Sequence, residues 1–484
     1  MKKENQYQFG MIGLGTMGSN LLLNIIDHGF SGAGYDKDPG KVSDLNGLNQ
    51  NNLKGFPDIN NFINCLQKPR TIMLLVPAGI IVDAVITELL PLLDKGDVII
   101  DGGNSYFRDT ERRYKELEEQ GFNFIGMGVS GGEEGARKGP SMMPGGNEKA
   151  YLQIKPILEK IAAQVDGEPT VTYIGPGAAG HFVKMVHNGI EYALMQIIAE
   201  TYEVLNRGLQ LDNEAIHKVF QKWNKGRLQS FLLEITEDIF TFKKPGEDHL
   251  LLDDIKDEAK AKGTGKWTSQ VAMDINLPIS VIDTAVSMRD LSKYKSLRMQ
   301  ASEIYADEKD VVLSDNSGDY IKNLEQAFYF CMVTAYAQGM QLLSKASTDF
   351  KYELELDQIA KIWRGGCIIR SAFLENIYDA FQSNKDLEHL LLDPDIQVDL
   401  KKSLPGIRKL VSDAAKHGFA LPAYSASLSY FDAFRSKKLP ANLIQAQRDY
   451  FGAHTYELIG KEGVFHTEWQ SEMKKLSLKG NSIS

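Results

Sequence analysis

The chain contains 484 residues, of which 43% are hydrophobic and 24% are charged, and its formal net charge at pH 7 is −10. These values are typical of a globular protein of two or three domains. The acidic balance argues against a general role on nucleic acids or membrane surfaces, so an anionic ligand must be bound by a local cluster of Arg and Lys side chains. The expected ligand is therefore a small molecule.

The N-terminus and the cysteines predict a cytoplasmic location. The N-terminus passes from charged residues directly into a Gly-rich segment, without the apolar core of a signal peptide, and no apolar run reaches the length of a membrane span. The cysteines are odd in number and widely spaced, which predicts reduced thiols: Cys65, Cys331 and Cys367. Their spacing fits no zinc site, and we expect no metal.

The first stretch of the chain has the pattern of a dinucleotide-binding fold. Residues 7–12 predict a strand, residues 21–26 predict a helix, and residues 33–35 predict a second strand that ends at Asp36. Glycines between strand and helix allow a tight bend and a close approach of the backbone to a pyrophosphate. These glycines are Gly10, Gly13, Gly15 and Gly18. An acidic residue about 20 positions further on completes the pattern.

Strands and helices then alternate as in a parallel sheet. Residues 71–76 and 97–101 predict strands, and residues 80–93 and 109–120 predict the helices that follow them. We therefore predict an α/β domain of the Rossmann type over residues 1–178.

Loops rich in Gly, Asn and Ser follow three successive strands, at residues 77–79, 102–105 and 129–137. Such residues also form ordinary turns. However, the carboxyl ends of parallel strands lie at one edge of a sheet, where ligands bind. Three such loops in succession therefore favour a shared cleft.

A long helix is predicted over residues 177–207, because this stretch begins at a Gly-Pro-Gly sequence and contains no proline. At the helical period its polar side chains form one stripe: Lys184, His187, Asn188, Glu191 and Tyr192. One alternative is a solvated face held by salt bridges. The remaining residues are mostly apolar, which instead indicates a buried helix, and buried charges must be paired or must line a cleft. This stripe is the candidate active site.

Beyond residue 178 the pattern becomes helical, which predicts an all-α domain over residues 179–434. A faint internal repeat supports a duplicated bundle, because four residues recur at a constant offset. Ser230, Leu233, Glu234 and Phe240 match Ser371, Leu374, Glu375 and Phe381.

The last segment, residues 435–484, is predicted to be a tail. Its end is rich in Gly, Ser and Lys, a composition that is normally disordered at a terminus. Residues 442–456 contain too many apolar and aromatic side chains to remain in water. We expect this part to dock, with a second subunit as one candidate surface.

Seven motifs, distributed from the first strand to the tail, resemble the signatures of one enzyme family. They are GLGTMG, IIDGGNS, SGGEEGARKGPSMMPGG, GHFVKMVHNGIEY, KGTGKWT, WRGGCIIRS and LPANLIQAQRDYFGAHTYE. On these motifs the chain is identified as a member of the 6-phosphogluconate dehydrogenase family, the decarboxylating dehydrogenases of the pentose phosphate pathway. The resemblance covers essentially the whole chain and implies the long-chain form of the family, a homodimer.

The resemblance implies a reaction and two catalytic residues. 6-Phosphogluconate would be oxidised and decarboxylated to ribulose 5-phosphate and CO2. Lys184 matches the general base that takes the proton of the hydroxyl at carbon 3, and Glu191 matches the acid that protonates carbon 1 of the enediol. Burial in an apolar helix would lower the pKa of Lys184 toward the neutral state that a base requires.

The resemblance also implies the binding residues. Those for substrate are Asn104, Ser130, Gly131, Gly132, His187, Asn188, Tyr192, Lys262 and Arg289, with Arg448 and His454 from the tail of the second subunit. Those for cofactor are Gly10, Gly13, Leu14, Gly15, Thr16, Met17, Gly18, Asp36, Lys37, Asp38, Val76, Pro77, Ala78 and Asn104. The cations would gather the positive charge that an acidic protein needs to hold a sugar-acid phosphate.

The expected cofactor is NAD, with NADP as the second candidate. NADP-using relatives carry Asn-Arg-Thr after the second strand, where this chain has Asp36, Lys37 and Asp38. A carboxylate here accepts hydrogen bonds from the free ribose hydroxyls of NAD and repels the 2′-phosphate of NADP. Lys37 lacks the planar fork with which arginine binds phosphate. Pro77 stands where we expect NADP-using members to carry a lysine.

Two other functions fit parts of the sequence. A β-hydroxyacid dehydrogenase that does not decarboxylate would share the Gly-rich strand, the Ser-Gly-Gly loop and the Lys and Asn of the long helix. Glu191 and the docking tail argue against it. A non-catalytic dinucleotide-binding sensor would be expected to have lost Lys184 or Glu191, and both are present.

Overall fold

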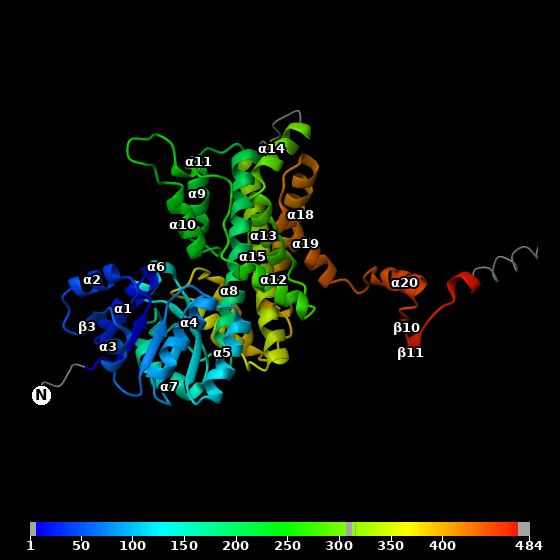
Figure 1. Ribbon diagram of the computed structural model, residues 1–484. Coiled ribbons are helices and arrows are strands. Elements are labelled where there is room, and N and C mark those ends of the chain that lie inside the picture. The colour runs from blue at the N-terminus through cyan, green and yellow to red at the C-terminus, as the bar shows by residue number, and fades with distance from the viewer. Residues whose placement is uncertain (1–5, 306–311, 315, 473–484) are drawn as a thin grey trace, which may run out of the picture. The chain divides into compact units, whose positions relative to one another are not determined.

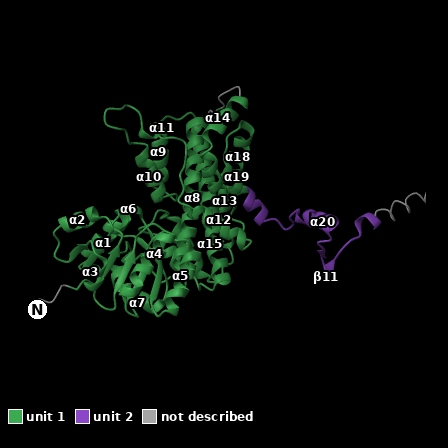
Figure 2. Cartoon of the chain, viewed as in Figure 1, with its two compact units in different colours: residues 1–428 green, residues 429–484 purple. Residues whose placement is uncertain are grey.

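The structure is a computed structural model that describes residues 6–305, 312–314 and 316–472. It divides into two compact units, residues 1–428 and 429–484, shown in green and purple in Figure 2. The division falls inside helix α19 (Pro422–Phe434), whereas the sequence predicted a tail that begins at residue 435. The α/β part and the helical part both belong to unit 1.

The first part of unit 1 is a seven-stranded sheet with the order β3-β2-β1-β4-β5-β6-β7. Neighbouring strands are parallel, except that β7 runs antiparallel to β6. The strands are β1 (Phe9–Ile12), β2 (Gly32–Tyr35), β3 (Leu53–Phe56), β4 (Thr71–Leu74), β5 (Val98–Asp101), β6 (Asn123–Ser130) and β7 (Ser141–Gly146). The sequence did not reveal β3 or β7, because Gly and Pro interrupt their strand patterns.

Helices cover both faces of the sheet (Figure 1). Successive side chains of a strand point to opposite faces, so Met11 and Ile100 join one core whereas Ile12 and Ile99 join the other. The first core includes residues of α1 (Thr16–Asp27), α2 (Pro39–Gly47), α6 (Gly132–Lys138) and α7 (Glu148–Ile161). The second includes residues of α3 (Ile59–Asn64), α4 (Ile80–Leu89) and α5 (Phe107–Glu119). The predicted Rossmann-type architecture is confirmed.

The second part of unit 1 is helical, and two long helices, α8 (Ala179–Glu203) and α15 (Ser317–Phe350), pack against each other within it. The predicted helix over residues 177–207 is α8 followed by a π-helical turn, Val204–Gly208. The other helices are α9 (Asn213–Trp223), α10 (Phe231–Ile239), α11 (Leu251–Asp254), α12 (Thr264–Asp274), α13 (Ser280–Ser292), α14 (Lys295–Ile304), α16 (Leu356–Trp363), α17 (Phe373–Ser383) and α18 (Pro394–His417). Across the described ranges, no helix is long and apolar enough to cross a membrane.

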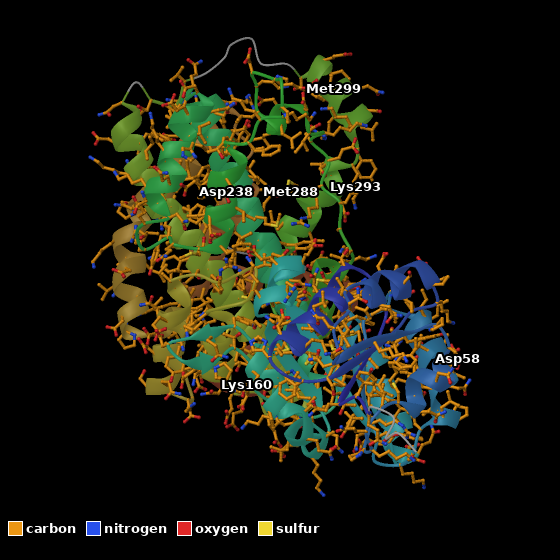
Figure 3. The ribbon with its side chains drawn as sticks, turned by 90° about the vertical axis from the view of Figure 1, so that its left-hand side faces the viewer. Asp58, Lys160, Asp238, Met288, Lys293 and Met299 are labelled. Atoms are coloured by element: carbon orange, nitrogen blue, oxygen red, sulfur yellow. The ribbon has the colours of Figure 1, made fainter. Side chains whose placement is uncertain are left out.

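The side view in Figure 3 shows the two parts of unit 1. Asp238, Met288, Lys293 and Met299 label the helical part, and Asp58 and Lys160 label the α/β part. Helix α8 contacts both parts, because it packs on β6 and β7 as well as on α12, α13 and α15. A stripe of polar residues on α8 therefore lies where sheet and bundle meet.

The two segments of the predicted repeat lie against each other. Helices α9 and α10 form one pair, and α16 and α17 form the other. The first matched residues, Ser230 and Ser371, face each other in an antiparallel bridge. Their hydroxyls act differently, because Ser230 Oγ accepts the Leu233 N–H at the start of α10, whereas Ser371 Oγ lies 3.1 Å from the Tyr336 hydroxyl. This arrangement supports a duplication, which stays a prediction.

Unit 2 is organised around a buried carboxylate. It contains α20 (Ala441–Gly452) and a hairpin of β10 (Tyr456–Leu458) and β11 (Lys461–Phe465). The Asp449 carboxylate accepts hydrogen bonds from the backbone N–H groups of Thr455 and Thr467 and the rings of His466 and Trp469. Although burial opposes ionisation, these bonds lower the pKa of Asp449 to about 2. The Gly-, Ser- and Lys-rich end of the predicted tail lies outside the described residues.

Candidate active site

The loop after β1 has the geometry of a pyrophosphate cradle. Gly13 has a φ of +95°, and a side chain there would lie 2.4 Å from the Leu75 carbonyl oxygen. A side chain at Gly18 would lie 1.8 Å from the Gly13 carbonyl oxygen. Gly15 faces open space at the N-terminus of α1, which has no side-chain cap. The N–H groups of the first turn can therefore donate to a phosphate, and the loop fits a dinucleotide.

Gly10 does not belong to this cradle, although the sequence predicted it there. It lies inside β1, and a side chain at this position would collide with the side chains of Leu66 and Phe62, 2.8 Å away. Glycine at this position is required for packing against Leu66 and Phe62, and the predicted cofactor contact of Gly10 stays a prediction. Leu14 lies in the loop itself, and Thr16 and Met17 begin α1. These three residues belong to the cradle and the start of α1, and their cofactor contacts stay predictions.

The loop after β2 is held by its own carboxylates. Asp36 accepts the Leu14 N–H at 2.7 Å and the Asp38 N–H at 2.9 Å, and Lys41 Nζ lies 3.3 Å away. Although partial burial opposes ionisation, these interactions lower the pKa of Asp36. The Asp38 carboxylate accepts the Gly40 N–H at 2.8 Å and caps α2. The cap formed by Asp38 was not predicted, although an Asp that precedes Pro39 is a typical start of a helix.

One buried arginine joins the loops after β4 and β5. Arg113 donates to both oxygens of Asp83 and to the Gly79 carbonyl oxygen, and its Nη1 lies 3.4 Å from Asp101 Oδ2. The other oxygen of Asp101 accepts the Gly103 N–H at 3.1 Å. The two loops carry the predicted cofactor positions Val76, Pro77, Ala78 and Asn104.

The polar stripe of α8 makes a chain of contacts with the end of β6. Lys184 Nζ lies 3.3 Å from His187 Nδ1, and Asn188 Oδ1 lies 3.1 Å from the same nitrogen. Ser130 Oγ lies 3.2 Å from His187 Nε2. The Asn188 oxygen can only accept a hydrogen bond, so His187 Nδ1 carries the proton and donates it to this oxygen. Nε2 is then free of a proton and accepts a hydrogen bond from the Ser130 hydroxyl. The fold thus brings four predicted site residues together.

Glycines allow β6 and α8 to approach so closely. A side chain at Gly128 would lie 2.4 Å from Lys184 Cβ. Beyond Ser130 the backbone turns through Gly131 and Gly132, which have φ values of +111° and +63°. Gly132 faces open space, so its backbone is accessible to a ligand.

Burial sets the charges of the two predicted catalytic residues. It lowers the pKa of Lys184, which Glu191 and Cys367 oppose, and it raises the pKa of Glu191, which Lys184 and Arg289 oppose. Burial also holds the pKa of His187 well below its usual value, and the charge of Lys184 acts in the same direction. The amine is therefore moved toward its neutral form and the carboxyl group toward its protonated form.

Arg289 extends the stripe toward the helical part. Its guanidinium carbon lies 3.5 Å from the centre of the Tyr192 ring. Helix α12 packs directly on the same ring, because a side chain at Gly265 would lie 2.5 Å from it. Lys262 is exposed just before this helix. Glu191, Tyr192 and Arg289 are thus grouped as the sequence predicted.

Arg448 and His454 lie in a different compact unit from the α8 stripe. Both are exposed in unit 2. Arg448 Nη1 donates to Gln445 Oε1 at 3.2 Å, and the His454 ring makes an edge contact with the Phe451 ring. Within one chain, these two predicted substrate residues have no defined position relative to Lys184.

Sequence reasoning missed two residues that surround the stripe. The Trp363 ring contacts the His187 ring edge-on, with centroids 5.5 Å apart. Cys367 is fully buried, and burial raises the pKa of its thiol to about 12 despite the opposing charge of Lys184. The available signal was the motif WRGGCIIRS, which contains both residues.

One group of acidic and imidazole side chains lies outside the stripe. Ligand atoms of Glu247, His249 and Asp254 lie within 4.8 Å of one another, and all three residues are exposed. Lys244 pairs with Asp254 at 2.9 Å. The Lys244 ammonium group thus already pairs with this cluster. Such an arrangement is typical of a surface ion-pair network.

Comparison with known proteins identifies the family. Residues 8–175 match the family model of the NAD binding domain of 6-phosphogluconate dehydrogenase, and residues 180–469 match that of its C-terminal domain. The chain belongs to the 6-phosphogluconate dehydrogenase family. This confirms the family predicted from the motifs.

Individual relatives match over almost their whole length. The NADP(+)-dependent, decarboxylating 6-phosphogluconate dehydrogenase of Bacillus subtilis is 48% identical over 466 residues, which cover 96% of this chain and 99% of the relative. The decarboxylating 6-phosphogluconate dehydrogenase of Escherichia coli K12 is 48% identical over 467 residues, with the same coverage. The 6-phosphogluconate dehydrogenase of Plasmodium falciparum, solved with NADP+ and with 6-phosphogluconate, superposes with a TM-score of 0.92. It is 44% identical and covers 96% of this chain and 100% of its own.

Proposed function

We propose that this chain catalyses the oxidative decarboxylation of 6-phosphogluconate to ribulose 5-phosphate and CO2 with a nicotinamide cofactor. The observation that carries the proposal is the arrangement of Lys184, which is buried, and Glu191, which is partly buried, on one face of α8. Their pKa values are moved in the directions that a base and an acid require. Membership of the 6-phosphogluconate dehydrogenase family supports the choice of substrate.

Lys184 acts first in the proposed reaction. Its neutral amine takes the proton from the hydroxyl at carbon 3, while the bound cofactor supplies a nicotinamide ring that accepts the hydride from the same carbon. His187, kept neutral by burial, packs beside the amine, with Nδ1 3.3 Å from Nζ, and adds no second positive charge there. The new carbonyl group lies β to the carboxylate, so it takes up the electrons that CO2 leaves behind. The Lys184 ammonium group returns its proton to the carbonyl oxygen, and an enediol forms.

Glu191 completes the reaction. Its protonated carboxyl group donates a proton to carbon 1 of the enediol while the hydroxyl at carbon 2 gives its proton to the Lys184 amine, which yields ribulose 5-phosphate. Lys184 and Glu191 lie seven positions apart on one helix face, so both can face the same bound substrate. The proton gained by the amine and the proton lost by the carboxyl group balance over one turnover.

The groups around Lys184 and Glu191 suit a sugar-acid phosphate. Ser130 and Asn188 supply a hydroxyl and an amide for hydrogen bonds to sugar hydroxyls. Arg289, stacked on Tyr192, and the exposed Lys262 supply positive charge for the phosphate. Asn104 lies at the end of β5, where substrate and nicotinamide would meet.

NAD is proposed as the preferred cofactor. Asp36 has a lowered pKa and stays ionised, so it can accept hydrogen bonds from the ribose hydroxyls of NAD. The same charge repels a 2′-phosphate. The relative from Bacillus subtilis is NADP(+)-dependent, and NADP is therefore the alternative for this chain.

Unit 2 is proposed to dock on a second copy of the chain in a homodimer. Its surface carries large apolar side chains that are exposed in the single chain, a pattern that marks interaction sites. They are Leu443, Ile444, Tyr450, Phe451, Ile459 and Val464. Docking would deliver Arg448 and His454 to the site of the other subunit. The cytoplasmic location stays a prediction.

The function is tested by parallel assays of the purified protein with 6-phosphogluconate, using NAD in one and NADP in the other. Reduced cofactor and released CO2 are measured together, and we expect equal amounts of both and a higher kcat/KM with NAD. Oxidation without CO2 would support the β-hydroxyacid dehydrogenase instead. Cofactor binding without any turnover would support the sensor. A kcat/KM with NADP at least equal to that with NAD would refute the preference for NAD.

A further inference from the structure

Both lysines at the end of β2 are already paired with carboxylates. Lys41 Nζ, in the first turn of α2, lies 3.3 Å from Asp36 Oδ2 in the loop that precedes the helix. Lys37 Nζ lies 3.3 Å from Glu88 Oε2, which belongs to α4. An incoming phosphate would have to compete with a carboxylate for either ammonium group. The pair of Lys37 and Glu88 also joins two elements that the sequence separates widely.

The other charged groups at this place are acidic. Asp38 caps α2, and Asp58 caps α3 by accepting the Asn61 N–H at 2.9 Å. Burial raises the pKa of Tyr35 at the end of β2, and the carboxylates of Glu88, Asp58 and Asp36 add to this effect, whereas Lys37 opposes it. The three carboxylates and the Lys37 ammonium group therefore all lie close enough to Tyr35 to act on its hydroxyl. The carboxylates outnumber the ammonium groups here, which is unfavourable for a dianion.

Glu88 lies on the exposed face of α4. Ile81, Ala84 and Glu88 follow one another at i, i+3 and i+7 and are all exposed, so they form the outward face of α4. The side chains of Lys37 and Glu88 are 71% and 37% exposed. An ion pair in such surroundings is weak and sensitive to salt, so removing it should leave the fold intact.

We propose that Glu88 is a specificity-determining residue that weakens binding of the 2′-phosphate of NADP by holding the Lys37 ammonium group. The proposal rests on the nicotinamide-dependent function proposed above. It adds a residue from α4 to the acidic motif at residues 36–38. Glu88 acts through Lys37 and does not itself contact the reacting atoms.

The first test compares two halves of the cofactors, 2′,5′-ADP and 5′-AMP, which differ only in the 2′-phosphate. Their dissociation constants are measured by calorimetry for the wild type and for Glu88→Gln. We expect Glu88→Gln to bind 2′,5′-ADP ~3- to 5-fold more tightly, the range of an exposed ion pair, and 5′-AMP with less than a ~2-fold change. The gain should shrink at high salt.

The control is Glu159→Gln, which removes a similarly exposed glutamate that pairs with Lys155 on α7 at 3.6 Å. This variant should change neither dissociation constant. A gain for 2′,5′-ADP in Glu159→Gln equal to that in Glu88→Gln would reduce the effect to net charge and overturn the proposal. An unchanged ratio of the two constants in Glu88→Gln would overturn it as well.

The second test asks whether Glu88 acts through Lys37. In a Lys37→Gln background, Glu88→Gln should no longer improve binding of 2′,5′-ADP, because no ammonium group is released. An improvement of the same size in both backgrounds would contradict the mechanism. In the kinetic assay, Glu88→Gln should raise kcat/KM for NADP by the same factor and leave that for NAD unchanged.

The outcomes for Glu88 and for the proposed function are separate. A wild type that does not decarboxylate 6-phosphogluconate refutes the function, whereas the binding of 2′,5′-ADP still tests Glu88. A wild type that prefers NADP refutes the preference for NAD, whereas an unchanged ratio in Glu88→Gln refutes the role of Glu88.

Discussion

Two pairs, each of a basic residue and a histidine, differ in their exposure to solvent. Lys184 and His187 are buried on α8, and burial lowers the pKa of both side chains. Arg448 and His454 are exposed on unit 2, whose large apolar side chains also face water in the single chain. The groups that shift the pKa values of the first pair belong to the same chain. We propose that the second pair becomes covered when unit 2 docks on a second copy of the chain.

This difference separates two contributions to activity. Changes around Lys184 should alter rate constants and pH dependence, because they change the charge of groups that take or give protons. Changes in unit 2 should alter association and substrate binding, because its apolar face and its cations are proposed to meet a second subunit. The predictions below test this separation, beginning with the largest expected effect.

Removal of unit 2 should have the largest effect. A chain that ends before Leu439 lacks Arg448, His454 and the exposed apolar face of α20. We expect no measurable activity and a shift from dimer to monomer, measured by light scattering and by CO2 release. A chain that ends after residue 472 serves as the control and should keep both properties. A truncated chain that is monomeric and fully active would contradict the docking proposal.

Substitution of Lys184 or Glu191 should have the second-largest effect. Lys184→Met and Glu191→Gln should each lower kcat by ~100-fold or more, the range expected for loss of a general base or acid. Circular dichroism should show that both variants remain folded and light scattering that both remain dimeric. Near-normal turnover of either variant would remove that residue from the mechanism.

The pH dependence of kcat should report the same pair. The amine of Lys184 must be neutral, so activity should fall as pH decreases through its lowered pKa. The carboxyl group of Glu191 must be protonated, so activity should fall as pH increases through its raised pKa. Each limb should change by roughly tenfold per pH unit. A profile without an acid limb would show that Lys184 is not the titrating base.

Asp449→Asn should have the smallest effect of the four. The folded pKa of about 2 lies below the usual value of an aspartate side chain, so the ionised carboxylate stabilises unit 2 above about pH 4 and loses this effect as pH falls through 2. The variant should show roughly tenfold faster amide exchange in residues 441–465 at neutral pH, because charge-assisted hydrogen bonds are lost. Its activity should fall less than that of the truncated chain. Unchanged exchange would show that Asp449 does not organise unit 2.

Local patterns in the sequence were sufficient for several features. The spacing of glycines predicted the turn at Gly13 to Gly18, because backbone conformation there depends on the residue itself. The helical period predicted that Lys184 and Glu191 share a face of α8, because residues at i and i+7 of any helix do so. The extended motifs identified the family, which the comparisons confirmed.

Contacts between distant segments were decided only by the tertiary structure. The sequence could not show that Gly10 packs under Phe62, that Ser130 meets His187, or that Glu88 holds Lys37. Each contact joins residues on different strands and helices, so it depends on how these elements pack. The pKa shifts of Lys184 and Glu191 have the same origin, since burial by sheet and bundle together removes the water that would stabilise their charges.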